Sequence, residues 1–179
     1  MNDYEKIRRR YKPDHLKVLL IAESPPPPPA VQSSRQFYYS DRLRKDDRLF
    51  INTIKAIYPE AAAETETALQ ADKTAWLNRF KADGFYMIEA LDISQPHAVS
   101  KQQRQYLIHQ SLPKLLSKVK KLATSDTKII LIKSNVFEVT AEPLKRAGFN
   151  VLNKAIVDYP GRYNQKAYRH KLAGLLIEN

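Results

Sequence analysis

Short runs of apolar residues alternate along the chain with longer segments whose apolar residues recur every three or four positions. The apolar runs predict four buried strands, at 18–21, 85–88, 128–132 and 150–152. The intervening segments, of which 108–122 is the clearest, have the apolar spacing of helices. Continuous apolar strands are typical of a parallel sheet that is covered on both faces. The pattern therefore predicts a three-layer α/β/α sandwich with a short, mainly parallel four-stranded sheet.

The length of 179 residues is that of one domain, and we expect a single α/β domain over 1–179. Residues 1–15 form a predicted N-terminal helical arm. The Ala- and Glu-rich segment 59–72 contains four acidic residues and no basic one, which indicates an acidic insertion. Pro113 interrupts the clearest helical pattern, and it either kinks one long helix or begins a second.

The composition excludes several kinds of site. The chain has no cysteine, which excludes disulfides, thiolate zinc sites, iron–sulfur clusters and cysteine nucleophiles. Its four glycines do not form a phosphate-binding loop or a dinucleotide-binding fingerprint. The four histidines do not have the spacing of metal ligands. We therefore predict neither a metal nor a cofactor.

The charge indicates a polyanionic partner, with DNA the best candidate. Lys and Arg total 30 and Asp and Glu total 19, which leaves a net charge of +11. Two segments, 101–121 and 162–171, contain six and four basic residues and no acid, which favours one positive face. The beginning of the sequence is polar and no apolar run has the length of a membrane span. We expect a cytoplasmic monomer that contacts no membrane and is nucleoid-associated if it binds DNA.

Functional side chains are expected at the carboxyl ends of the strands, where ligands bind in open α/β sheets. Glu23 follows the first strand and meets five consecutive prolines, which form a stiff loop able to hold its carboxylate in place. The alternative is that the proline run is a docking peptide for a partner domain. The aromatic residues at 37–39 either stack on bases or fold back to cover the sheet.

These residues resemble the uracil-DNA glycosylase superfamily, whose members are small α/β sandwiches with a short parallel sheet. Ala22-Glu23-Ser24-Pro25-Pro26 is similar to the G-E-A-P-G motif that follows the first strand in one branch of that family. Phe37 lies fourteen residues beyond Glu23, near the position of the phenylalanine that stacks on the flipped base in that branch. The segment 159–164 is similar to the last motif of the family. The resemblance spans residues 17–176 in order and spacing.

The resemblance implies a role for each of these side chains. Glu23 would stabilise positive charge on the sugar or activate water, and Tyr159 would donate a hydrogen bond to the leaving base. The implied base-binding residues are Phe37, Glu89 and Ser24. The implied DNA-binding residues are Arg42, Arg44, Lys133, Arg162 and Lys166.

The chain also departs from the family. The family's recognition asparagine corresponds to Glu89, which keeps an acceptor for a base N–H but loses the donor for a carbonyl. This change favours a different base edge or no base at all. The last motif has Tyr159, or Asp158 in a register shifted by one, in place of a histidine. The branch with the G-E-A-P-G motif typically carries four cysteines for an iron–sulfur cluster, which this chain lacks.

Three functions follow from these observations. The first is base-excision repair of DNA, in which the chain hydrolyses the N-glycosidic bond of a deaminated or damaged base. The second is a non-catalytic nucleic-acid or nucleotide-binding protein of the same fold. The third is a protein-interaction module built on the proline run. A nuclease that binds a divalent ion through Glu23, Asp92 and Asp158 is a further rival.

Overall fold

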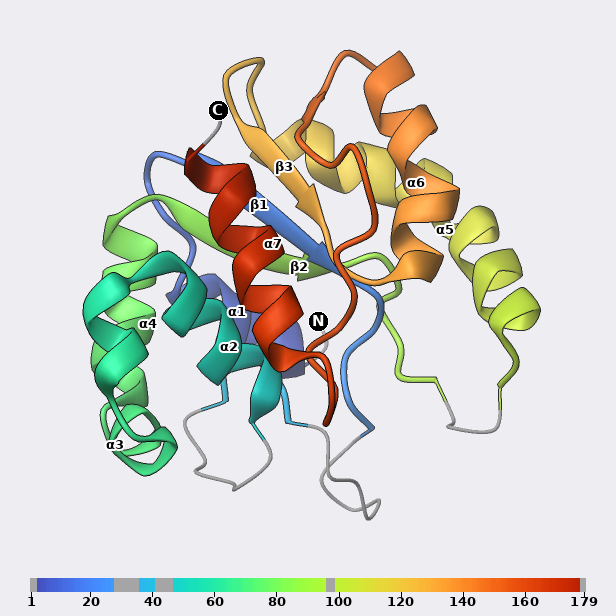
Figure 1. Cartoon of the computed structure of the whole chain (residues 1–179). Coiled ribbons are helices and arrows are strands. Elements are labelled where there is room, and N and C mark those ends of the chain that lie inside the picture. Colours follow the sequence, from blue (N-terminus) through green and yellow to red (C-terminus); the bar gives the residue numbers. More distant parts are fainter. Residues whose placement is uncertain (1–2, 28–35, 41–46, 96–98, 178–179) are drawn as a thin grey trace.

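The computed structural model describes residues 3–27, 36–40, 47–95 and 99–177. It is a mixed α/β fold with a four-stranded parallel sheet, as the apolar pattern predicts (Figure 1). The elements in chain order are α1 (Asp3–Arg10), β1 (Val18–Ala22), α2 (Arg48–Ile57), the 3-10 helix η1 (Pro59–Ala63), α3 (Glu66–Ala71), α4 (Lys73–Ala82), β2 (Phe85–Glu89), α5 (Lys101–Leu122), β3 (Lys128–Leu131), α6 (Ser134–Arg146), β4 (Asn150–Val151) and α7 (Gln165–Ile177).

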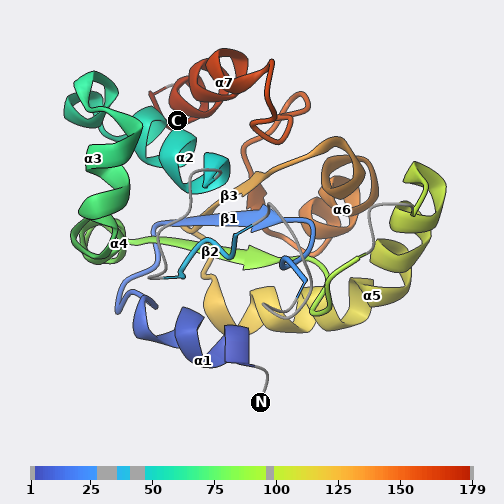
Figure 2. The same cartoon turned by 90° about the horizontal axis from the view of Figure 1, so that it is seen from below.

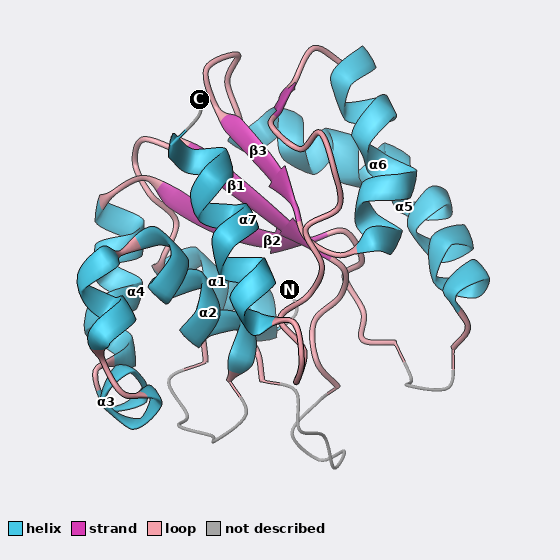
Figure 3. Ribbon diagram, viewed as in Figure 1, coloured by secondary structure: helices cyan, strands magenta, loops and turns pink. Residues whose placement is uncertain are grey.

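The sheet has the strand order β2-β1-β3-β4, and each neighbouring pair is parallel. The chain moves from β1 to β2 on one side and then crosses to β3 on the other side of β1. The direction of winding therefore reverses between β1 and β3, which is where open α/β sheets bind their ligands. Figure 3 shows that the carboxyl ends of β1, β2 and β3 converge on one place from which the following loops depart.

Helices cover both faces of the sheet. Figure 2 shows α2 and α7 on one side of the strands and α1 and α5 on the other. The helices α5 and α6 pack together, as do α2 and α7. The two central strands form the middle of the core, because Leu19, Leu20, Ile21, Ile129 and Ile130 have no exposed surface. No helix in the described part of the chain is both long and apolar enough to cross a membrane.

Side chains extend the hydrogen bonding of the sheet at two places. The edge strand β2 has its Met87 N–H bonded to the hydroxyl oxygen of Tyr39 at 2.6 Å, which protects that edge from pairing with another chain. Beyond β4, the Asn153 side chain accepts from the Leu131 N–H at 2.7 Å and donates to the Leu131 carbonyl at 2.9 Å. This amide therefore replaces a backbone pair where the short fourth strand has ended.

The turn before β2 requires glycine. Gly84 has a φ of +87°, and a Cβ there would lie 2.8 Å from the carbonyl oxygen of His15. The Gly84 carbonyl accepts from the N–H groups of Lys17 and Val18, at 2.8 and 3.1 Å. This close approach fixes the start of β2 against the start of β1.

The structure decides between alternatives that the sequence left open. The helix α5 runs unbroken through Pro113, which is exposed, so water can reach the His109 carbonyl that loses its helical donor. The acidic segment 59–72 forms η1 and α3 and packs on the core through Ala61 and Leu69, neither of which has exposed surface. The helix of the N-terminal arm ends at Arg10.

Candidate functional site

A cavity of about 180 Å³ lies at the carboxyl ends of the first three strands. Its lining includes Glu23, Phe37, Glu89 and Tyr159, the four residues that the family resemblance implies should meet. An apolar cavity of about 150 Å³ already accepts benzene. The cavity is therefore large enough to receive a flat ring.

Glu23 is fixed at the cavity wall by three donors. It follows β1 directly and is only 4% exposed. Arg104 Nη1 donates to its Oε1 at 2.8 Å, while Asn135 Nδ2 and Lys133 Nζ both lie 2.8 Å from Oε2. Burial alone would raise the pKa of this carboxyl, but the bonds from Lys133 and Asn135 and the charge of Arg104 outweigh burial and lower it. Glu23 is therefore an ionised, immobile carboxylate.

Two of the three donors were not identified from the sequence. Arg104 lies in the first turns of α5, whose start is stabilised by a capping box between Ser100 and Gln103. Arg104 is four residues before the buried Ile108, so it occupies the apolar face of that helix. An arginine on an apolar face is a signal that could have revealed it. Asn135, in the first turn of α6, gives no such local signal.

Lys133 is the strained residue of the site. Its φ of +84° makes it the one non-glycine residue with a positive φ in the part of the chain that the structure describes. Such a conformation costs a residue with a Cβ roughly 1–3 kcal/mol and persists where the surroundings impose it. Its N–H donates to the Val157 carbonyl at 2.7 Å, and its ammonium group meets Glu23. We expected Lys133 to bind DNA, and the structure places it in the cavity wall against Glu23.

Glu89 provides the second buried carboxylate. It ends β2, is 5% exposed, and forms a buried ion pair through Oε2 with Nη2 of Arg8. Arg8 also bonds to Glu5, one turn before it in α1. Burial raises the pKa of the Glu89 carboxyl above its ordinary value, against the opposing effect of Arg8. No group among the described residues donates to the other oxygen, Oε1.

Phe37 belongs to the core and also lines the cavity. It is 3% exposed and packs on Tyr4, with 4.6 Å between the ring centroids. The Arg8 guanidinium lies 5.6 Å from the same ring. Tyr38 and Tyr39 are buried beside it. Of the two alternatives for these aromatic residues, the structure shows the one in which they fold back and cover the sheet, with Phe37 still at the cavity.

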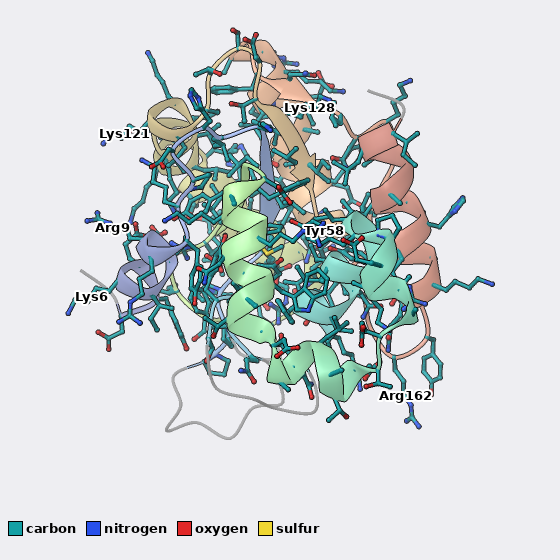
Figure 4. All side chains as sticks on the ribbon, turned by 90° about the vertical axis from the view of Figure 1, so that its left-hand side faces the viewer. Lys6, Arg9, Tyr58, Lys121, Lys128 and Arg162 are labelled. Carbon is teal, nitrogen blue, oxygen red and sulfur yellow. The ribbon has the colours of Figure 1, made fainter. Side chains whose placement is uncertain are left out.

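The remaining expected site residues lie around the cavity or away from it. Ser24 is buried and lines the cavity, and Tyr159 is half-buried and also lines it. Arg162 and Lys166 are exposed at the start of α7. Figure 4 shows Arg162 at the opposite end of the molecule from Lys128, which begins β3. Two further candidates, Arg42 and Arg44, lie outside the described residues.

The basic segment 101–121 carries less uncompensated charge than its sequence indicates. Four of its six basic residues form ion pairs with acids, which are Lys101–Glu138 at 2.9 Å, Arg104–Glu23 at 2.8 Å, and Lys114–Asp92 and Lys118–Asp92 at 2.6 Å each. Asp92 is therefore engaged by two lysines, and Asp158 is exposed. Within the described ranges, no three His, Asp or Glu side chains gather as a metal site.

Comparison of the chain with models of known protein families, with curated proteins and with solved structures finds no match. We therefore infer its function from the residues of the cavity and their chemistry.

Proposed function

We propose that this chain is a DNA-binding protein with a uracil-DNA glycosylase-like fold that takes one base into the cavity and hydrolyses its N-glycosidic bond. One observation carries the proposal. Glu23, Phe37, Glu89 and Tyr159 are distant in sequence, yet they line a single cavity where the sheet reverses its winding. Chemistry on a base requires that the base leave the stack and enter a pocket of this kind.

Glu23 has the properties that the reaction needs at the sugar. Cleavage of the glycosidic bond develops positive charge on the sugar, which a fixed and ionised carboxylate stabilises. Water adds its oxygen to the sugar C1′, and the bonding electron pair leaves with the base nitrogen, which takes up a proton. The hydroxyl of Tyr159, which also lines the cavity, is a donor that would stabilise the leaving base.

A second candidate, base binding without hydrolysis, is favoured by the surroundings of Glu23. Arg104 and Lys133 together carry two positive charges against one negative charge, so the cluster is cationic overall. Three donors also occupy three of the about four lone-pair positions that could accept a proton from water. The lowered pKa weakens Glu23 as a general base. Under this candidate the cavity and the DNA surface have the same roles, and only the chemical step is lost.

The chemical step is tested on duplex and single-stranded oligonucleotides containing uracil, hypoxanthine, xanthine or a damaged guanine that keeps its ring N–H and amino group, followed by alkaline cleavage of abasic sites. The proposal predicts strand breaks with the wild-type protein and their loss in Glu23→Gln. Glu60→Gln, at an exposed carboxylate paired with Arg79, is the matched control and should cleave normally. Salt-dependent DNA binding without breaks on any of the substrates would reject hydrolysis and leave the second candidate.

The binding step is tested by measuring DNA affinity as a function of salt concentration. If Arg162 and Lys166 contact phosphates, changing either one to alanine should reduce the slope of log K against log salt by about one. Lys128→Ala, at the far end of the molecule, is the control and should leave the slope unchanged (Figure 4). Equal slopes for all three variants would place the DNA on another surface.

A further inference from the structure

We infer that the cavity selects a base whose edge carries two adjacent N–H donors, as guanine does, in preference to uracil. This inference rests on the proposed function, because it names the class of base that the same cavity receives. The residue that carries it is Glu89, the buried carboxylate at the end of β2.

Glu89 presents acceptors and no donor to the cavity. The ion pair with Arg8 favours the ionised form of Glu89, which has two oxygens with about four lone-pair positions and no hydrogen to donate. One oxygen of Glu89 accepts from Arg8, and among the residues that the structure describes nothing donates to Oε1. The side chain therefore retains acceptor capacity for two further N–H groups, one at each oxygen. A buried carboxylate with unused acceptors is costly unless a ligand or water supplies donors.

The orientation of Glu89 is fixed by a chain of contacts from α1. Arg8 pairs with Glu89 and is itself held by Glu5. The same guanidinium lies over Phe37, whose ring lines the cavity beside Glu89. A base that lies against Phe37 would therefore meet a carboxylate that cannot rotate away.

The edges of the bases differ in what they offer to such a carboxylate. Guanine carries a ring N–H next to an amino group, so it supplies two donors side by side. Hypoxanthine keeps the ring N–H and lacks the amino group. Uracil has one N–H between two carbonyl oxygens, and those oxygens face the negative charge of Glu89, which has no donor to offer them. Discrimination of this kind combines an added attraction with a repulsive contact against the wrong ligand.

The inference is tested with short oligothymidylates that differ only in one central base: guanine, hypoxanthine or uracil. Binding is measured by fluorescence anisotropy at one salt concentration, so the phosphate contribution is common to all three. We expect the guanine oligonucleotide to bind about tenfold more tightly than the hypoxanthine one, because one charge-assisted hydrogen bond separates them. Uracil should bind more weakly than either.

The variant Glu89→Gln should abolish the preference for guanine, because an amide has a single acceptor oxygen and places an amino group against the base donors. It also removes one of the two counter-charges of the buried Arg8 and leaves it with Glu5 alone, so folding must be checked by circular dichroism. The double variant Arg8→Met with Glu89→Gln removes both members of this ion pair and tests the same loss of preference without the buried charge of Arg8. Glu60→Gln should keep the full preference.

Three results would overturn the inference, and they bear differently on the proposed function. Equal affinity for the three oligonucleotides, or tighter binding of uracil, rejects the base class and leaves DNA binding intact. A guanine preference that survives in a folded Glu89→Gln protein or in the double variant shows that another residue reads the base. If no oligonucleotide binds, both the base class and the proposed function fail.

Discussion

The positive φ of Lys133 makes a prediction about stability that can be worked out from the backbone alone. Replacing Lys133 by alanine removes the ion pair with Glu23 but keeps a Cβ at a φ of +84°. Replacing it by glycine removes the same ion pair and the Cβ together. The difference between the two variants therefore isolates the conformational cost, because the loss of the ion pair is common to both.

The magnitude follows from two opposing terms. A Cβ at a φ of +84° and a ψ of +142°, a region that glycine alone ordinarily occupies, costs roughly 1–3 kcal/mol. Glycine loses more chain entropy on folding than alanine, which costs about 0.5–1 kcal/mol. We therefore expect Lys133→Gly to be more stable than Lys133→Ala by about 1 kcal/mol. For a domain of this length, that difference corresponds to about 2–4 °C in melting temperature.

Urea unfolding followed by circular dichroism measures the difference directly. An exposed helical site provides the matched control, and Glu142 in α6 is suitable. There Glu142→Ala should be more stable than Glu142→Gly by about 1 kcal/mol, the reverse order. If alanine is also the more stable residue at position 133, the strain at Lys133 is absent and the reasoning is refuted.

Two further predictions concern Glu23 and its partners. Because the pKa of Glu23 is lowered from its ordinary value of 4.5, its ionised form stabilises the fold above that pH, and this contribution is lost as the pH falls through the folded-state pKa. Acid titration of unfolding should therefore show a shallower loss of stability in Glu23→Gln than in the wild type, and identical profiles would contradict this. Arg104→Met should destabilise the protein by about 3 kcal/mol, because it removes a buried partner of Glu23. Lys101→Met, which breaks an exposed pair in the same helix, should cost less than about 1 kcal/mol, and similar losses in urea unfolding would contradict this prediction.

The strands could be predicted from the sequence because each is a short apolar run with a clear start or end. The predicted strand 18–21 corresponds to β1 at Val18–Ala22, and 128–132 to β3 at Lys128–Leu131. Once the strands are known, the positions of Glu23 and Glu89 follow, because parallel strands place their carboxyl ends at one edge. The meeting of these two residues at one cavity was therefore within reach of sequence reasoning.

The partners of these carboxylates were not predicted, because they come from segments far away in the chain. Arg8 is the first of three consecutive arginines, and the structure buries it while its neighbour Arg9 stays exposed. Helical spacing places Tyr4, Arg8 and Tyr11 on one face of α1 and of the turn that follows it. Two aromatic residues on the same face as Arg8 are a signal that this face is buried. No local pattern indicates that Lys133 has a positive φ, because that conformation is imposed by the contacts on both sides of it.

The long-range ion pairs also determine when the cavity can form during folding. Arg8 and Glu89 are 81 residues apart, Arg104 and Glu23 are also 81 apart, and Asn135 is 112 residues from Glu23. Contacts of such high sequence separation form slowly, because the chain loses the entropy of a long open loop before the contact can stabilise it. During synthesis on the ribosome, Arg8 and Glu23 are made early, and the residues that pair with them are added only much later. We therefore expect the cavity to be among the last parts of the protein to be completed, so that slow steps in folding delay ligand binding more than the formation of helices.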